Sequence, residues 1–233
     1  MNSHAKSFED IQAIAFDLDG TLVDSVPGLA KAMQLTLADL ALPTVTDEQI
    51  KTWVGNGIDK LIERALNAVK APLSLQAEAQ THFHQHYRQH IDSGTRLFPG
   101  VKQTLQTLKD NGYPIALVTN KAAKFLPDLL ASLEIQDYFN LVLGEGDVIK
   151  LKPHPAPLYL VMATFGIYSD QLLFIGDSRN DIRAAKNAQC PTIGMSYGYN
   201  YGEPISYTHP DVICDKFTEI LSYLSLPKPA AKK

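Results

Sequence analysis

The chain has 233 residues, with 21 lysines and arginines against 25 aspartates and glutamates, and a formal net charge of −4 at pH 7. This balance disfavours nucleic acids and anionic membranes as partners, because both attract basic patches. No apolar run approaches the about 20 residues of a membrane span, and acidic residues stand where a signal peptide would be apolar. We therefore expect a cytoplasmic protein, long enough for one domain plus an insertion.

The two cysteines, Cys190 and Cys214, lie in separate apolar stretches, with no CxxC pattern and no histidine at a metal-ligand spacing. A chain of this length buries enough apolar surface to fold without disulfide bonds. We predict two free thiols in the core of a protein from a reducing compartment.

Five short apolar runs, each followed by a polar residue or glycine, are typical of buried parallel strands. They cover residues 13–16, 115–118, 141–143, 172–175 and 192–195. Helical patterns with stop signals lie between them, at residues 101–111, 155–165 and 181–189. Because strands and helices alternate, we predict an α/β fold with a doubly wound parallel sheet.

Residues 25–94 interrupt this alternation. Apolar positions at the helical period of 3.6 residues cover residues 27–42, 47–54, 58–70 and 75–91. We predict a helical insertion over residues 25–94 and an α/β core made of residues 1–24 and 95–233. Two linkers would then run side by side and form a hinge. The tail from Leu226, rich in proline, alanine and lysine, is predicted to be disordered.

Two carboxylates, Asp17 and Asp19, follow the first strand in the segment FDLDGTLVDS. Side chains two residues apart on extended backbone point the same way, so both carboxylates can face one spot beyond the sheet. Open α/β sheets bind ligands at this edge. Two close carboxylates repel by about 4 kcal/mol at 4 Å and an effective dielectric near 20, so the pair needs a cation or a shared proton.

Other strand ends add matching groups. Thr119 and the following backbone N–H groups stand at the end of the second strand, Asp177 and Asp181 in GDSRND at the fourth, and Lys152 before a helix. Together they supply carboxylates, a hydroxyl and a cation, which suits Mg²⁺ and a phosphate group.

The order DxDGT, strand-terminal Thr, Lys and GDxxND resembles the haloacid dehalogenase superfamily across nearly the whole chain. The resemblance implies that Asp17 is the nucleophile and Asp19 the general acid and base. It implies that Thr119 and the Asn120 amide hold the phosphoryl oxygens while Lys152 balances charge. Asp17, the Asp19 carbonyl and Asp177 would bind Mg²⁺, with Asp181 supporting its water ligands. The helical insertion resembles the cap of this superfamily.

Within the superfamily, WVGNGIDKLIERAL in the insertion and YGYNYGE after the fifth strand are similar to the phosphoglycolate phosphatases of bacteria. This implies hydrolysis of 2-phosphoglycolate by a monomer or homodimer. Gly55, Asn56 and Gly57 precede a helix, where free backbone N–H groups could meet a substrate carboxylate. Arg64, two turns along, is the next candidate for this carboxylate.

Three alternatives remain open. A sugar phosphomutase must keep water from its phosphoaspartate, and mutase relatives often carry an aliphatic residue at the position of Thr21, which we include among the substrate-binding residues. A nucleotidase or pyrophosphatase would use a similar cap. A receiver domain also combines acidic residues, Thr and Lys, but carries no cap.

The segment HFHQHYRQH places His82, His86 and His90 on one helical face, with His84 off that row. Two histidines on successive turns can bind zinc, but no carboxylate or cysteine accompanies them in this segment. We therefore predict an ordinary solvated face.

Overall fold

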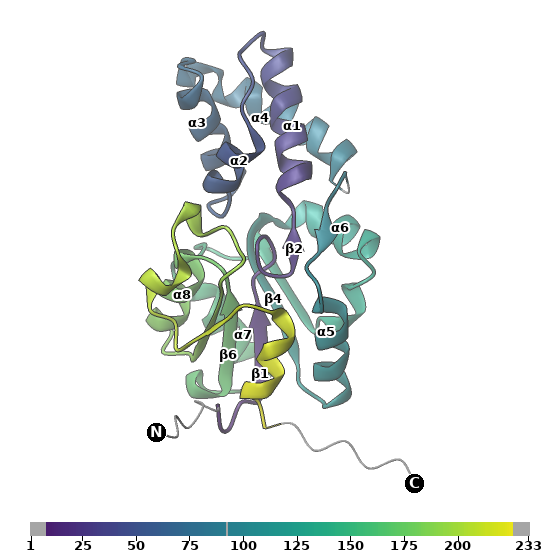
Figure 1. Ribbon diagram of the computed structural model, residues 1–233, viewed down its shortest axis with the longest axis vertical. Helices are drawn as coiled ribbons and strands as arrows, with labels where there is room; N and C mark the ends of the chain where they lie inside the picture. Colours follow the sequence, from purple (N-terminus) through teal and green to yellow (C-terminus); the bar gives the residue numbers. More distant parts are fainter. Residues whose placement is uncertain (1–7, 92, 226–233) are drawn as a thin grey trace.

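A computed structural model describes residues 8–91 and 93–225. Its main sheet has six parallel strands in the order β5-β4-β1-β6-β7-β8. The strands are β1 (Ala13–Phe16), β4 (Ile115–Ala122), β5 (Leu141–Glu145), β6 (Leu172–Gly176), β7 (Thr192–Met195) and β8 (Val212–Cys214). All five predicted strands are present, and the doubly wound α/β fold is confirmed (Figure 1).

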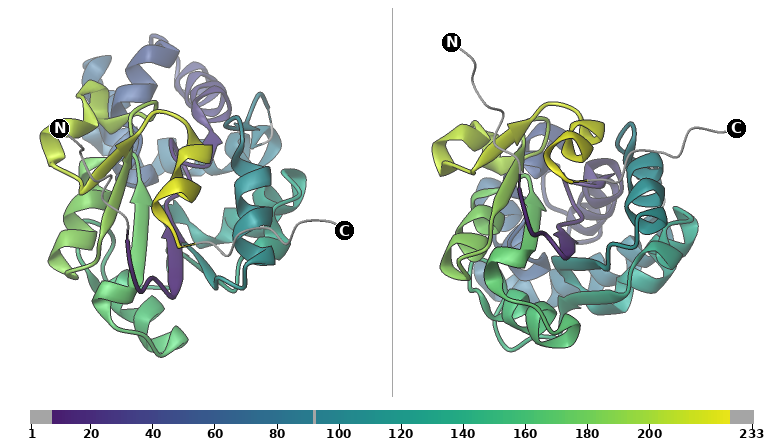
Figure 2. Two further views of the ribbon diagram at one scale, coloured as in Figure 1. Left: turned by 60° about the horizontal axis from the view of Figure 1, so that its bottom comes forward. Right: turned by 90° about the horizontal axis from the view of Figure 1, so that it is seen from below.

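Helices cover both faces of this sheet (Figure 2). The core helices are α5 (Val101–Asp110), α6 (Leu126–Ser132), α7 (Ala156–Phe165) and α8 (Arg179–Asn187). Ile14 and Phe16 of β1 belong to the apolar cluster that contains α5 and α6. Ala13 and Ala15, on the opposite face, belong to the cluster that contains α7 and α8. Because both faces of β1 are buried, its sequence is apolar without alternation.

Short 3-10 helices connect several elements. They span Leu73–Leu75, Ala123–Phe125, Gln136–Tyr138, Ser169–Gln171, Asn200–Gly202, Ile205–Thr208 and Phe217–Tyr223. The sequence analysis did not predict β8, whose three residues are too few for a periodic apolar signal. It also missed α6, although Leu126, Leu129 and Leu130 follow the helical period. The last core helix begins at Arg179 rather than Asp181, which places Asp181 in its first turn.

Four helices form the insertion: α1 (Val26–Asp39), α2 (Asp47–Trp53), α3 (Ile58–Ala68) and α4 (Gln76–His90). They pack on one another beyond the carboxyl edge of the sheet (Figure 1). Their apolar stripes meet in an interior where Leu37, Ile62 and Phe83 are completely buried. Thr46 caps α2 through reciprocal hydrogen bonds with Gln49. All four helices lie where the helical period places them.

The two linkers between the sheet and these helices lie side by side. β2 (Val23–Asp24) pairs antiparallel with β3 (Arg96–Leu97). The guanidinium of Arg96 lies 3.4 Å from the carboxylate of Asp24.

Cys190 and Cys214 are buried and unpaired, as predicted. Among the described residues, no helix has both the length and the apolar character required to cross a membrane. The tail from Leu226, for which we predicted disorder, lies outside the described residues.

Candidate active site

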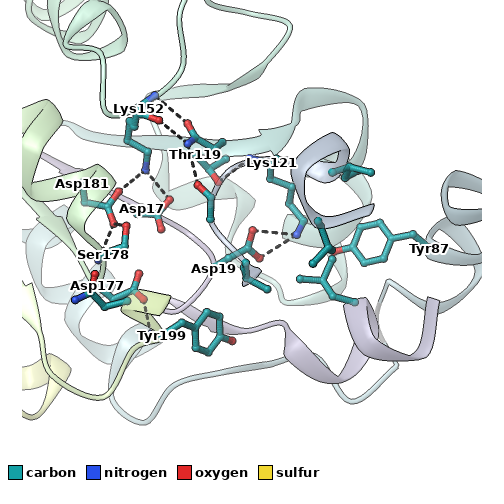
Figure 3. A pocket seen from close by; sticks show the side chains of 18 residues that line it. Asp17, Asp19, Tyr87, Thr119, Lys121, Lys152, Asp177, Ser178, Asp181 and Tyr199 are labelled. Atoms are coloured by element: carbon teal, nitrogen blue, oxygen red, sulfur yellow. Dashed lines mark hydrogen bonds and ion pairs between the residues drawn. The ribbon is translucent and has the colours of Figure 1, made fainter. Parts of the chain in front are cut away.

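A pocket lies between the carboxyl edge of the sheet and helices α1, α3 and α4 (Figure 3). The core lines it with Asp17, Asp19, Thr119, Asn120, Lys121, Lys152, Asp177, Ser178, Asp181, Tyr199 and Asn200. The insertion lines it with Leu29, Val54, Gly55, Gly57, Ile58, Leu61 and Tyr87. The structure thus brings together all the core residues selected from the sequence except Thr21, which lies just behind the pocket wall.

Lys152 is a buried cation on the core side of the pocket (Figure 3). Its Nζ lies 2.7 Å from Asp17 Oδ1 and 2.7 Å from Asp181 Oδ1, and it donates a hydrogen bond to the Val118 carbonyl at 2.6 Å. A buried ammonium requires such partners, because it has lost its hydration. Lys152 therefore holds the Asp17 carboxylate in place through one of its oxygens.

Asp17, Asp177 and Asp181 form an acidic triad, with one carboxylate oxygen of each within 4.8 Å of the others. All three side chains are buried. The single charge of Lys152 leaves the triad two charges short of neutrality, which one divalent cation would balance. Because the donors are all oxygen, the triad fits a hard cation such as Mg²⁺.

Burial and repulsion between the carboxylates shift the pKa values of the triad. Burial raises the pKa of Asp17 to about 7, with Lys152 opposing the rise and Asp181 adding to it. Burial also raises the pKa of Asp177 well above its usual range, with repulsion from Asp181 and Asp17 as further causes. The ionised triad is therefore unfavourable without a cation.

Two glycines make room for Asp177. Gly20 has a φ of +92°, and a Cβ there would lie 2.3 Å from Asp177 Oδ2. A Cβ at Gly198 would lie 2.1 Å from the Asp177 Cβ. Thr21 donates its hydroxyl hydrogen to Asp177 Oδ1 at 3.1 Å, and the Tyr199 N–H donates to Oδ2 at 2.6 Å. Thr21 thus orients Asp177 from behind the pocket.

β4 continues four residues beyond its predicted end, so Thr119, Asn120 and Lys121 belong to the strand. The Thr119 hydroxyl accepts a hydrogen bond from the Lys121 N–H at 3.1 Å. The Asn120 amide donates to the carbonyls of Lys152 at 2.8 Å and Gly55 at 3.0 Å, and its oxygen accepts from the Lys152 N–H at 3.0 Å. Asn120 therefore joins β4 to the Lys152 loop and to the loop before α3.

Lys121 is a functional candidate that the sequence analysis missed. Its ammonium donates to both Asp19 oxygens, at 2.9 and 3.1 Å, and lies 5.0 Å from the ring centre of Tyr87 on α4 (Figure 3). Burial alone would lower the pKa of Lys121, but attraction to Asp19 raises it above its usual range. Lys121 therefore stays charged. Its position two residues after Thr119 was the available signal, since such residues share one side of a strand.

On the insertion side, Gly55 and Gly57 line the pocket, and α3 begins directly after Gly57. Asn56 and Arg64 do not line it. Arg64 donates instead to the Asn56 side-chain oxygen at 2.8 Å and to the Trp53 carbonyl at 2.5 Å. These two bonds hold the loop in shape from outside the pocket.

A second group from the core also contacts this loop. Asn180 of α8 donates to the Gly55 carbonyl at 2.9 Å and to the Tyr201 hydroxyl at 2.7 Å. The Tyr201 ring lies 5.5 Å from the guanidinium of Arg64 and 4.2 Å from that of Arg179. The tyrosine-rich segment after β7 therefore docks the insertion onto the core.

The core part of the site falls within a known family. The family profile described as haloacid dehalogenase-like hydrolase matches residues 14–195, which include every core residue discussed above from Asp17 to Asp181. The chain belongs to this family.

Individual haloacid dehalogenase-like hydrolases resemble this one over nearly its whole length. The chain is 49% identical over 222 residues to the phosphoglycolate phosphatase of Yersinia pestis, covering 94% of this chain and 96% of that one. Identity to the phosphoglycolate phosphatase of Escherichia coli K12 is 47% over 239 residues, covering 94% and 95%. A crystal structure described as a predicted phosphoglycolate phosphatase from Haemophilus somnus 129PT has a TM-score of 0.88 and 40% identity, covering 91% and 97%.

The family's four motifs occupy one edge of the sheet in this member. DxDGT follows β1, Thr119 lies in β4, Lys152 precedes α7 and GDxxND joins β6 to α8. In a parallel sheet these chain positions meet even though they are far apart in sequence.

Proposed function

We propose that this chain is a Mg²⁺-dependent phosphatase that hydrolyses 2-phosphoglycolate to glycolate and phosphate through an aspartyl-phosphate. The distribution of charge in the pocket carries this proposal. The acidic triad lies on the core side of the pocket, where Lys152 holds its member Asp17. The second pocket lysine, Lys121, lies toward the insertion, against Tyr87. A short substrate with a phosphate at one end and a carboxylate at the other matches this arrangement, as do the names of relatives at 49% and 47% identity.

In the first half-reaction, an Asp17 oxygen attacks phosphorus and the bond from phosphorus to the glycolate oxygen breaks. Asp19 gives its proton to the leaving alkoxide, so that glycolate departs as an alcohol. In the second, Asp19 takes a proton from a water molecule that attacks phosphorus. The P–O bond to Asp17 breaks, and phosphate and the free carboxylate result.

Other core residues lower the charge barrier to this attack. A carboxylate approaching a phosphate dianion meets a like charge, which the Lys152 ammonium offsets from 2.7 Å behind Asp17. The Thr119 hydroxyl and the Asn120 backbone N–H would donate hydrogen bonds to the phosphoryl oxygens. Asp17, the Asp19 carbonyl and Asp177 would hold Mg²⁺. Asp181, already bonded to Lys152 and Ser178, would orient its water ligands. When bound, the ion supplies positive charge that favours the anionic nucleophile and substrate.

We assign recognition of the substrate carboxylate to Lys121 and the N-terminus of α3. Lys121 is a buried ammonium in the pocket wall, and the first N–H groups of α3 lie beside Gly57 on the facing wall. Unpaired N–H groups at a helix start favour an anion. Leu29, Ile58 and Leu61 supply an apolar surround in which such charge-assisted bonds strengthen.

Phosphate release from a panel of small esters, with and without EDTA, tests the proposed activity. Phosphoglycolate should be the best substrate, and EDTA should stop its hydrolysis. Preference for nucleotides or pyrophosphate would favour the nucleotidase or pyrophosphatase alternative. Conversion of glucose 1-phosphate to glucose 6-phosphate would favour the mutase.

Removing the charge of Lys121 should change specificity. In Lys121→Met, kcat/KM for phosphoglycolate divided by that for ethyl phosphate should fall roughly tenfold to a hundredfold, the value of one or two hydrogen bonds to a charged group. Ethyl phosphate is the comparison because it has an alkyl leaving group and no carboxylate.

Lys124→Met is the matched control for this variant, since Lys124 is exposed nearby and contacts His84. An equal fall for both esters would mean that Lys121 only orients Asp19. Gly57→Val should lower the same ratio by blocking the start of α3, whereas Asn56→Ala should change it less, because Asn56 bonds to Arg64 outside the pocket.

Removing divalent ions should make stability depend on pH. The pKa of Asp17 rises from 3.8 to about 7 on folding, so its stabilising contribution is complete below pH 3.8 and is lost as the pH rises through 7. Mg²⁺ should therefore increase the Tm more at about pH 8 than at about pH 5. Thermal unfolding with EDTA or Mg²⁺ measures this gain, and an equal gain at both pH values would contradict the cation site. Asp177→Asn should reduce the gain.

We propose further that residues 25–94 act as a cap that closes over the core by bending at β2 and β3. The paired linkers support the bending point, and the Asn120 and Asn180 bonds to Gly55 are the contacts that hold the cap against the core.

The two buried, unpaired thiols favour a reducing compartment such as the cytoplasm.

A further inference from the structure

A second cluster of metal-ligating side chains lies on the cap, between α1 and α4. Asp39, the last residue of α1, faces His82 and His86 on successive turns of α4. Its Oδ2 lies 2.6 Å from His86 Nε2 and 3.1 Å from His82 Nδ1, and the three ligand atoms all lie within 4.8 Å of one another. The sequence analysis expected no carboxylate beside these histidines. That was wrong, because Asp39 comes from a different helix, 47 residues before His86.

We propose that Asp39, His82 and His86 form a binding site for a transition-metal ion of the zinc class. Two imidazoles and one carboxylate suit Zn²⁺, Co²⁺ or Ni²⁺, whereas Mg²⁺ prefers oxygen ligands alone. The cap cluster and the acidic triad of the core therefore differ in the ions that they select. The inference is independent of the proposed phosphatase activity.

The ligands are already assembled. Both imidazoles contact the same Asp39 oxygen, Oδ2. Metal bonds of about 2.0 to 2.2 Å place tetrahedral donors about 3.4 Å apart. The three ligand atoms, all within 4.8 Å of one another, already lie near that spacing.

The environment also allows a fourth ligand. The side chains of Asp39, His82 and His86 are 41%, 32% and 16% exposed, so water can complete the coordination from the solvent side. His90 continues the row but contacts Ser93 instead. None of the three ligands lines the pocket, so the ion would not touch the substrate.

A bound ion would join the two helices that lead into the linkers. α1 begins directly after β2 and Ser25, and α4 ends shortly before β3. Cross-linking Asp39 to α4 would therefore stiffen the cap as one body, and its unfolding temperature should rise with the metal.

Titration with Co²⁺ tests the site, on untagged full-length chain with Mg²⁺ in large excess to occupy the core. We expect one Co²⁺ per chain, with the visible absorption of a low-coordinate ion, displacement by Zn²⁺ and a rise in Tm. Asp39→Asn and His86→Ala should weaken Co²⁺ binding by at least about tenfold, since each removes one of three ligands. His84→Ala, on the same helix but off the row, should leave it unchanged.

Two further measurements identify where the ion binds. The Tm of each variant without transition metal should stay near that of the parent, which separates ligand loss from misfolding. Asp177→Asn should leave Co²⁺ binding intact. Unchanged binding in His86→Ala, binding lost only in Asp177→Asn, or no Co²⁺ binding by the parent would overturn the proposal.

Discussion

Asp17→Asn is expected to reduce phosphoglycolate turnover by roughly 10⁴-fold or more, because an amide does not form the acyl phosphate. The fold should remain, since Lys152 keeps its contacts with Asp181 and the Val118 carbonyl. Stability without metal should hold or rise, because the substitution removes one negative charge from a buried acidic triad.

Phosphate release by purified variant and thermal unfolding in EDTA measure these two effects. Asp110→Asn is the matched control for charge, since Asp110 ends α5 and bonds only to Gln106 among the contacts described. Asp17→Asn activity within tenfold of the parent would rule out Asp17 as nucleophile. A large loss of Tm would show instead that the carboxylate serves the fold.

The core of the fold could be predicted because its strands are buried on both faces. Residues 13–16 and 192–195 match β1 and β7 in both bounds. The end of β4 could not be predicted, because Thr119, Asn120 and Lys121 are polar residues buried at the pocket rather than in an apolar core. Polar residues in a strand carry no apolar pattern, although here they form its functional end.

The core site was predictable for a related reason: motifs at the ends of parallel strands converge whatever their separation in sequence. Contacts between cap and core follow no such rule. Lys121 meets Tyr87, and Asn180 meets Gly55, across 125 residues in the second case. Such pairs depend on how the four helices pack over the sheet, and a single sequence leaves that packing open.

Asp19→Asn should slow phosphoglycolate turnover by about 10² to 10⁴-fold, since both the leaving alkoxide and the attacking water lose their proton-transfer partner. An asparagine oxygen still accepts a hydrogen bond from Lys121, so the pocket wall should keep its shape. The first half-reaction should depend on the leaving group. The p-nitrophenolate ion is a weak base that leaves with little protonation, so the pre-steady-state burst of its release should slow less than release of glycolate.

A double-mutant cycle separates this chemical role from the ion pair that Asp19 makes with Lys121. Lys121→Met should lower the preference for phosphoglycolate over ethyl phosphate, whereas Asp19→Asn should lower kcat for both esters and leave that preference nearly unchanged. Residues in contact couple, so the double variant should lose less activity than the two single losses multiplied together. Equal slowing of p-nitrophenol and glycolate release by Asp19→Asn would argue against acid catalysis. The carboxylate would then serve only to position the Lys121 ammonium.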